Sequence, residues 1–349
     1  MQSNYNAIDL MKFIMALFVV IVHVEPLMTI SPTFTYLFDK VIVRASVPFF
    51  FLAAGFFLYR KMNFDSLNLS IIGSYILRIF RVYFVWTILY LPLILYKLPN
   101  DLQSVKDTAK FFLREFFMIG SYAQLWFLPA LIMAVIFVTC LIKLQIKFKY
   151  IFIITGGLYI LGLLDQSYYG FFKEFWSDES GKLYKFLDYL QAIFGTTRNG
   201  FTFGALYVAI GAYIAFNNVK ISIKRTFIGS VIFAILFAIE FAILSHFEVI
   251  KDANTYIFTV PLTVSIFMLS KELKLPDSPI FLHLRQMSML FYYSHVLIAE
   301  PILLGSQSLN FELNRLLIFA ITIILLFLMS ELVIRLSSNK KFKFLKLLY

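Results

Sequence analysis

Apolar residues dominate the chain in ten long runs that short polar stretches separate. The runs cover residues 10–30, 40–60, 78–97, 123–143, 148–165, 200–217, 226–246, 254–270, 286–304 and 313–336. A bilayer core of ~30 Å needs about 20 apolar residues in one α-helix. The pattern therefore predicts an all-α membrane protein, a bundle of about ten transmembrane helices. Segments 106–119 and 181–196 are amphipathic and predict interfacial or re-entrant helices, either of which could change the count.

Composition supports a membrane environment for the whole chain. Of 349 residues, 60% are hydrophobic and only 15% are charged, whereas a soluble domain carries roughly 25% charged residues. We therefore expect residues 1–349 to form a single integral-membrane domain with lipid as part of its solvent. The first run contains His23 and Glu25 and lacks a clear small-residue cleavage site, so we interpret it as a helix of the mature protein and not as a signal peptide.

The basic residues that give the net charge of +11 lie at the ends of the apolar runs. Because the basic residues do not form one stripe, the charge does not indicate nucleic-acid binding. Lysines and arginines concentrate in alternate connections, whereas the connection 165–198 is mixed in charge. Since cytoplasmic loops carry the basic excess, both termini are predicted to be cytoplasmic, which requires an even number of spans.

Ionisable residues share one face of the first predicted helix. At 100° per residue, the eleven positions from Lys12 to His23 leave both side chains within about 20° of each other and roughly 16 Å apart along the axis. Asp9 lies three residues before Lys12 on the same stripe and could orient it. Ionisable groups inside a membrane usually face the bundle interior or a wet cavity. The alternative is a snorkelling lysine and a hydrogen-bonded structural histidine.

Other polar residues near the predicted spans are open to a functional or a structural interpretation. Arg78 and Arg81, placed at the cytoplasmic entrance of the third span, could clamp a phosphate or act as ordinary positive-inside anchors. Arg198 and Asn199 lie at the start of the sixth span on the outer side, and they too could bind a ligand or act only as anchors. Two further candidates lie inside spans, Glu240 and His295. A buried glutamate there would pair with a base or a substrate amine, whereas a lone histidine often makes only an interhelical hydrogen bond.

Signatures of soluble enzymes and of metal sites are missing from the sequence. There is no glycine-rich phosphate loop, no His-Glu-x-x-His and no Gly-x-Ser-x-Gly. The four histidines are dispersed and Cys140 is the single cysteine, so no metal is expected. The oligomeric state is left open between a monomer and a homodimer.

Several ordered blocks resemble the membrane acyltransferase-three family over residues 5 to 335. They are Ile8-Asp9-Leu10-Met11-Lys12 with His23, Arg44-Ala-Ser-Val-Pro48 continuing to Gly55, Arg78-x-x-Arg81, and Leu125-Trp126-Phe127-Leu128-Pro129-Ala130. Others are similar to one branch, the membrane half of the vancomycin-resistance serine racemases: Leu161-Gly162-Leu163, Ser167-Tyr168-Tyr169-Gly170, Thr197-Arg198-Asn199-Gly200 and Tyr292-x-x-His295.

The resemblance implies a ten-helix enzyme of the bacterial cytoplasmic membrane that passes an acyl group across the bilayer. It implies acyl-CoA, with acetyl-CoA expected, as the cytoplasmic donor, and a hydroxyl of an extracytoplasmic glycan or lipid-linked sugar as the acceptor. The family's catalytic histidine matches His23, and its arginine pair matches Arg78 and Arg81. The family usually has arginine where this chain has Lys12. Trp126 lies in a matched block and is an expected substrate contact.

The helix geometry and the resemblance suggest one arrangement. A CoA nucleotide held by Arg78, Arg81 and Lys12 could send its pantetheine arm toward His23, which would act as general base on an acceptor hydroxyl. Arg198 and Asn199 would contact the acceptor from the outer side. The serine racemase branch is associated with serine uptake, so transport of a small polar solute such as serine is the second interpretation. One scaffold can host both functions.

Overall fold

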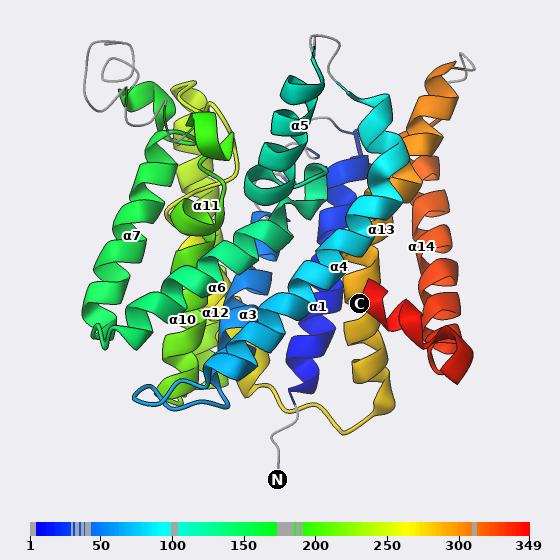
Figure 1. Cartoon of the computed structure of the whole chain (residues 1–349). Coiled ribbons are helices and arrows are strands. Elements are labelled where there is room, and N and C mark those ends of the chain that lie inside the picture. The colour runs from blue at the N-terminus through cyan, green and yellow to red at the C-terminus, as the bar shows by residue number, and fades with distance from the viewer. Residues whose placement is uncertain are drawn as a thin grey trace.

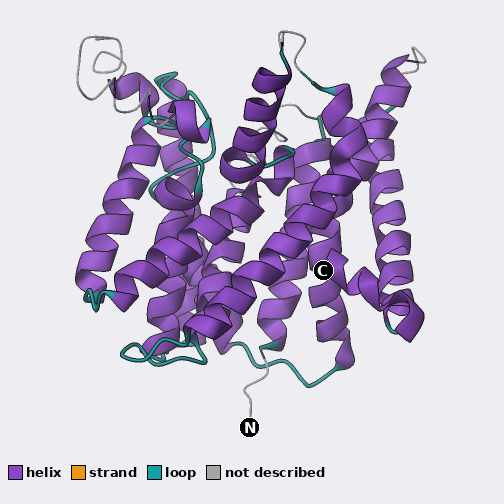
Figure 2. Ribbon diagram, viewed as in Figure 1, coloured by secondary structure: helices purple, strands orange, loops and turns teal. Residues whose placement is uncertain are grey.

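The computed structural model is a bundle of helices (Figure 2). It describes residues 5–28, 31, 35, 38, 43–98, 104–172, 185, 189, 191–308 and 313–349. Within these ranges the chain forms helices, turns and loops, with no β-strand. The all-α prediction is therefore confirmed for the described part of the chain.

The elements follow the chain in one order. They are α1 (Asn6–Val24), η2 (Val43–Ala45), α3 (Ser46–Tyr59), α4 (Leu69–Tyr96), α5 (Val105–Arg114), η3 (Glu115–Ile119), η4 (Ala123–Trp126), α6 (Phe127–Lys143), α7 (Phe148–Leu164), η5 (Tyr169–Phe172), η6 (Gly200–Gly204), α10 (Ala205–Phe216), α11 (Ile223–His246), α12 (Thr259–Glu272), α13 (Pro279–Ser308), α14 (Arg315–Ser337) and η7 (Lys340–Leu348).

Each of the ten predicted apolar runs overlaps a helix, and the helices differ in their ability to span a bilayer. Six are long and apolar enough to cross a membrane: Asn6–Val24, Leu69–Tyr96, Ala123–Lys143, Ile223–His246, Pro279–Ser306 and Arg315–Ser337. Three apolar helices are shorter, at 10–17 residues: Val43–Tyr59, Phe148–Leu164 and Gly200–Phe216. Residues 29–30 and 40–42 of the first two runs lie outside the described residues, as do residues 181–184, 186–188 and 190 of segment 181–196. Segment 106–119 forms α5 and η3.

The third helix begins earlier than the sequence pattern predicts. It starts at Leu69 and not near residue 78, because the Asn68 side chain accepts hydrogen bonds from the backbone N–H groups of Ser70 and Ile71 and so caps the helix. Arg78 and Arg81 consequently lie inside α4, more than two turns from its start. Their predicted position at the helix entrance is wrong.

Close backbone approach joins α3 to α10. A Cβ on Gly55 would lie 2.4 Å from the carbonyl oxygen of Val208, and a Cβ on Gly211 would lie 2.2 Å from that of Leu52. Small residues allow helices to pack this closely where no hydrophobic driving force acts between them. These two glycines therefore fix the separation of α3 and α10.

Several loops lie at the end of the bundle where α1 begins (Figure 1). Loops 60–68, 144–147, 217–222 and 273–278 lie there, and α14 also ends there. We call it the basic end, because these loops carry Lys61, Lys147, Lys220 and Lys274.

The outward faces of the bundle are apolar. On α11, Ile228, Ile232, Ile235 and Ile239 are each 44–55% exposed and follow one another at helical spacing. An exposed stripe of this kind is unfavourable in water and matches a lipid-facing surface. Together with the six helices of spanning length, it defines a multi-pass membrane protein.

Candidate active site

Two histidines from distant parts of the sequence meet near the C-terminal end of α1, opposite the basic end. His23 lies in the last turn of α1, and its ring centroid is 4.9 Å from that of His295 on α13. His295 is fully buried, whereas His23 keeps exposed surface although protein surrounds it. The side chain of His23 is therefore the more accessible of the two, and His295 has no exposed surface.

The tautomer of His295 follows from its hydrogen bonds. Its Nδ1 lies 3.1 Å from the carbonyl oxygen of Phe291 and 2.9 Å from that of Tyr292. Carbonyls only accept hydrogen bonds, so Nδ1 carries the proton and Nε2 is an acceptor. This Nε2 is buried without a hydrogen-bond partner among the described residues. His295 thus offers an acceptor atom close to His23.

The hydroxyl of Tyr90 on α4 replaces one backbone hydrogen bond of α13, in the turn that carries His295. Its hydroxyl donates to the carbonyl of Tyr293 at 2.8 Å and accepts from the N–H of Leu297 at 2.8 Å. These two backbone groups would otherwise bond to each other along the helix, so the hydroxyl is inserted between them. Tyr90 is fully buried. It therefore contributes to the position of His295.

A carboxylate that the sequence analysis did not select lies near the histidine pair. Glu300 of α13 forms an ion pair with Lys97 and accepts a hydrogen bond from the Tyr122 hydroxyl. Its charge acts on His23. An acidic residue inside an apolar run, next to Pro301, was the signal that could have indicated it.

Two arginines converge on one amide oxygen beside the histidines. Arg198 donates from Nη1 to Oδ1 of Asn254 at 3.0 Å, and Arg44 donates from Nη1 to the same oxygen at 2.8 Å. Both positive charges act on His23. The guanidinium of Arg198 also lies 4.6 Å from the ring centroid of Trp126, a cation–π geometry. Arg198 and Trp126, both predicted site residues, are thus in contact.

Burial affects the pKa of Arg198 but not its charge. It lowers the pKa of the guanidinium, and the nearby carboxylate of Asp252 opposes this shift. An arginine nevertheless stays protonated at any physiological pH. The side chain therefore remains a permanent cation at the site.

A polar network holds the loop that carries Arg198. Thr197 donates to the carboxylate of Asp165 at 3.1 Å and accepts from the side chain of Gln166 at 2.9 Å. Lys251 pairs with the same carboxylate at 2.8 Å. Because Thr197 is buried and bound on both sides, the following residue has a defined place.

Asn199 and Glu240 hold backbone groups in place. The Oδ1 of Asn199 accepts from the N–H groups of Phe201 and Thr202 at the start of η6. The carboxylate of Glu240 accepts from Ile257 and Phe258, just before α12. These hydrogen bonds give both polar side chains a structural role. The predicted contact of Asn199 and Glu240 with a substrate stays a prediction.

A large cavity of about 980 Å³ toward the basic end contains two of the three predicted donor-binding residues, Lys12 and Arg78. We call it the basic pocket. Its described lining includes six basic side chains and one carboxylate: Lys12, Arg60, Lys61, Arg78, Arg285, Lys346 and Asp9. It extends inward to Tyr293, two residues before His295. Such a cavity attracts an extended polyanion.

Helix α1 links the basic pocket to the histidine pair. Nζ of Lys12 lies 3.7 Å from Oδ1 of Asp9 and 4.3 Å from the ring centroid of Phe57. Nη1 of Arg285 lies 3.7 Å from Oδ2 of Asp9. Asp9 thus lies within ion-pair distance of two cations at the pocket wall, and its predicted role in orienting Lys12 stays a prediction. Arg81 is exposed on α4 and is not part of this lining, so only Arg78 of the predicted pair lies in the pocket.

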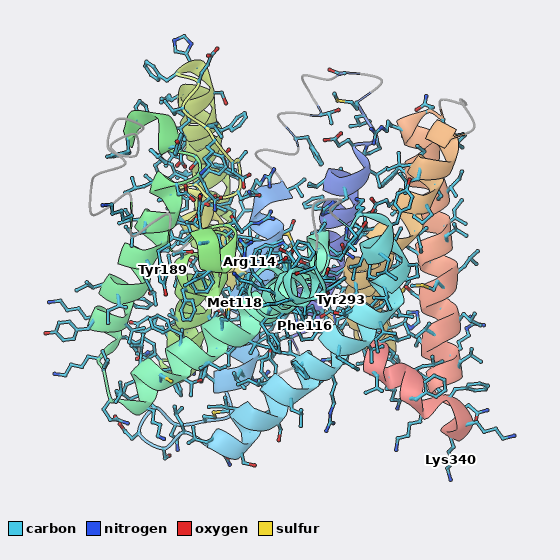
Figure 3. The ribbon with its side chains drawn as sticks, turned by 45° about the horizontal axis from the view of Figure 1, so that its top comes forward. Arg114, Phe116, Met118, Tyr189, Tyr293 and Lys340 are labelled. Carbon is cyan, nitrogen blue, oxygen red and sulfur yellow. The ribbon has the colours of Figure 1, made fainter. Side chains whose placement is uncertain are left out.

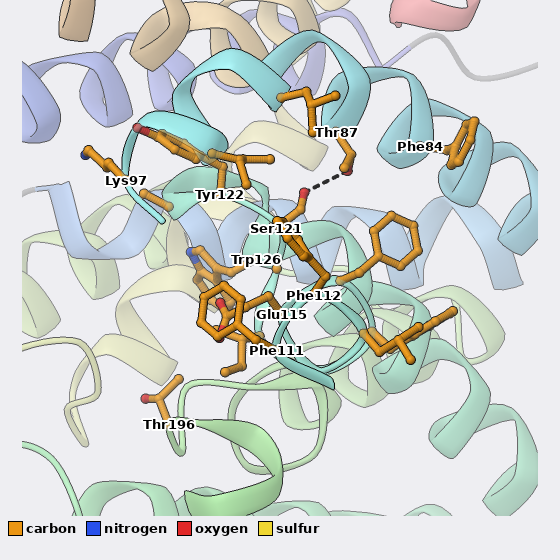
Figure 4. A pocket seen from close by; sticks show the side chains of 18 of the residues that line it. Phe84, Thr87, Lys97, Phe111, Phe112, Glu115, Ser121, Tyr122, Trp126 and Thr196 are labelled. Carbon is orange, nitrogen blue, oxygen red and sulfur yellow. Dashed lines mark hydrogen bonds between the residues drawn. The ribbon is translucent and has the colours of Figure 1, made fainter. Parts of the chain in front are cut away.

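A second cavity, of about 680 Å³, lies between α4 and the segment formed by α5 and η3. We call it the lateral pocket. Its outer wall is apolar and includes Phe84 and Phe117, each 50% exposed. Its polar lining includes Lys97, Tyr122 and Arg198, and Figure 4 shows the first two with the hydrogen bond between Thr87 and Ser121. These three polar residues belong to the surroundings of the histidine pair.

Among the described residues, no three or more His, Cys, Asp and Glu side chains form a group that could hold a metal ion.

Comparison with known proteins gives a family and three relatives. The family described as Acyltransferase domain matches residues 5–335. An amino-acid racemase of Enterococcus faecalis is 28% identical over 272 residues, covering 77% of this chain and 36% of the relative. A second amino-acid racemase of that organism is 26% identical over 344 residues, covering 97% and 47%. A serine/alanine racemase of Enterococcus gallinarum is 27% identical over 322 residues, covering 92% and 44%. No solved structure matches the chain.

The family match covers nearly the whole chain, so the protein belongs to the membrane acyltransferase family. This confirms the resemblance drawn from its sequence blocks. The chain spans less than half the length of these racemases.

Proposed function

We propose that the protein is an O-acyltransferase of the bacterial cytoplasmic membrane with ten spans and both termini in the cytoplasm. It would move an acyl group, expected to be acetyl, from cytoplasmic acyl-CoA to a hydroxyl of an extracytoplasmic glycan or lipid-linked sugar. The observation that carries the proposal is the position of His23. It lies in the last turn of α1, at the opposite end of that helix from Lys12 in the basic pocket, and its ring lies next to that of His295.

The basic pocket supports an acyl-CoA donor. Its cationic lining suits the phosphates of the CoA nucleotide, and charge-assisted contacts to phosphate are among the stronger polar interactions. Lys12 and Arg78 come from two different helices, so phosphates could bridge α1 and α4. The thin pantetheine arm would extend toward Tyr293, and its length is similar to the axial distance from Lys12 to His23.

The histidine pair supports general-base chemistry. His23 would accept the proton of the acceptor hydroxyl while the hydroxyl oxygen attacks the thioester carbonyl. The new ester bond forms, the carbon–sulfur bond breaks, and the CoA thiolate leaves and takes up the proton. His295 would accept a hydrogen bond from the second ring nitrogen of His23 after a small movement, which would set the His23 tautomer. The positive charges of Arg44 and Arg198 would stabilise the developing oxyanion.

The lateral pocket supports a lipid-linked acceptor. Its exposed phenylalanines would contact the hydrocarbon chain, and Arg198 and Lys97 would lie near the anionic link between chain and sugar. Ala123 lines this cavity and is exposed, so Ala123→Phe should fill the space and lower transfer to a lipid-linked acceptor. Ile136→Phe on the following helix α6, at a position 46% exposed and outside the lining, is the matched control.

Uptake of a small polar solute such as serine is the second candidate. One relative is named a serine/alanine racemase, and Arg44 with Arg198 could bind a carboxylate. An uptake protein would need no acyl-CoA site. Radiolabelled serine uptake into vesicles would separate the candidates, since only a transporter should concentrate the solute.

Two measurements test the acyltransferase proposal. Detergent-purified protein should bind acetyl-CoA in calorimetry. Mass spectrometry of cell-envelope polymers from a deletion strain should show the loss of one acyl substituent. An unchanged envelope together with no binding of several acyl-CoA species would contradict the proposal.

A further inference from the structure

The segment after α14 lies beyond the part of the chain that the family match covers. The match ends at residue 335, whereas η7 continues from Lys340 to Leu348. In Figure 1 this segment, drawn in red, turns back from the lower end of α14 toward α4 and α13. The family relationship therefore assigns it no role.

Two hydrogen bonds anchor the end of this segment to the bundle. The hydroxyl of Tyr349 lies 2.6 Å from Oγ of Ser337. Because the Ser337 hydroxyl donates its one proton to the carbonyl of Ile334 at 2.8 Å, Tyr349 must be the donor. The carbonyl of Leu348 accepts from Nε1 of Trp86 at 3.0 Å. Trp86 is 2% exposed and Tyr349 is 8% exposed, so these anchors are shielded from solvent.

The anchored segment forms part of the wall of the basic pocket. Lys346 and Tyr349 both line this cavity, with Arg78 of α4 and Arg285 of α13. Lys346 is exposed, as expected of a cation that faces an open cavity. The anchors also connect to the inner end of the pocket, because the ring centroid of Trp86 lies 5.9 Å from that of Tyr293.

We propose that residues 340–349 complete the donor site and that Lys346 binds a phosphate of the donor. The proposal rests on the proposed function, which supplies the phosphate-bearing ligand. The buried anchors hold the backbone beside the pocket before the ligand arrives, so little ordering entropy is lost when Lys346 makes its contact. Together with Arg78 and Arg285, Lys346 would bind from a third element and enclose the phosphate.

Lys340 provides a matched control on the same segment. It is also an exposed lysine of η7, but it is not part of the pocket lining. Figure 3 shows it at the outer edge of the molecule. A segment that acted only by attracting anions or anionic lipid in general would depend equally on both lysines.

Calorimetry with acetyl-CoA on the full-length purified protein tests the role of Lys346. Lys346→Ala should weaken binding about 3- to 10-fold, the range expected for an exposed charge-assisted contact, and Lys340→Ala should weaken it by less than about twofold. Equal effects of the two substitutions, or no effect of Lys346→Ala, would overturn the proposal. Absence of binding by the wild type would instead contradict the proposed donor, so the two failures are distinguishable.

Thiol labelling tests the position of the segment directly. In a Cys140→Ser background, the K346C and K340C variants would be treated with a negatively charged maleimide. Acetyl-CoA should slow the labelling of K346C and leave that of K340C unchanged. Tyr349→Phe, which removes the bond to Ser337, should reduce this protection. Protection of neither position by a ligand that the protein binds would place the donor elsewhere.

Discussion

The imidazole rings of His23 and His295 lie 4.9 Å apart, although they come from the first and the ninth predicted spans. His23 is exposed and His295 is fully buried. The pair therefore consists of one accessible and one buried imidazole. This difference leads to distinct expectations for the two histidines.

Replacement of His23 should abolish most of the chemistry. General-base assistance contributes about 10²–10⁴ in rate, so His23→Ala should lower acyl transfer by that factor while acetyl-CoA binding stays near the wild-type level. His295→Ala should cause a smaller loss, because His295 acts through His23. Transfer rates and calorimetry on the same preparations check this. A well-folded His23→Ala protein with near wild-type transfer would refute the assignment.

Tyr90 should act on transfer through the backbone of α13. Tyr90→Phe removes the hydroxyl that bridges Tyr293 and Leu297, and the loss of such buried hydrogen bonds costs about 1–3 kcal/mol of stability. Because His295 lies between those two residues, transfer should fall as well. Tyr59→Phe is the control, since it removes another buried hydroxyl contact, the 2.7 Å bond to Thr139. Thermal unfolding should show a loss for both variants, and only the first should reduce the rate constant for transfer.

The two arginines of α4 should differ in their effect on donor binding. Arg78 lines the basic pocket and Arg81 does not. Arg78→Ala should therefore weaken acetyl-CoA binding by the equivalent of about 1.5–3 kcal/mol, as expected for a hydrogen bond to a charged group, and Arg81→Ala should have a small effect. Dissociation constants from calorimetry measure the difference. Equal losses would show that the donor contacts the exposed face of α4.

The close packing of α3 and α10 should be sensitive to side-chain size. A Cβ on Gly211 would lie 2.2 Å from the carbonyl oxygen of Leu52, so Gly211→Leu should destabilise the bundle by at least roughly 1–3 kcal/mol. Gly157 on α7 has no atom within 4 Å of the position of a Cβ. Gly157→Leu should therefore leave the unfolding temperature nearly unchanged. A similar shift for both variants would contradict the observed approach of the helices.

The basic end of the bundle should face the cytoplasm. Reporter fusions after residues 62, 145 and 222 lie in loops of that end and should report a cytoplasmic location. Fusions near residues 104 and 248 lie at the opposite end of the helices and should report an external one. An external signal at residue 145 would reverse the proposed topology.

The sequence by itself determined the helices and the arrangement of groups along a single helix. Runs of apolar residues predict helices because each backbone N–H and C=O must be bonded within its own segment in lipid. Lys12 and His23 share α1 because their spacing is a property of the helical repeat. Several ordered blocks taken together, among them Leu125-Trp126-Phe127, also indicated the family.

Tertiary structure decided which of these groups meet. The contacts of His23 with His295 and of Arg198 with Trp126 depend on how α1, α13 and the loop before η6 pack. Helix periodicity contains no information on pairs so far apart in the chain. The start of α4 at Leu69 depends on one capping side chain, Asn68, which placed Arg78 deep in a helix and beside the basic pocket. Glu300 and Lys346 are recognisable in the sequence as charged residues, but only the tertiary structure shows which distant residues surround them. Interactions within a turn follow from local spacing, whereas those between helices depend on the packing of the whole bundle.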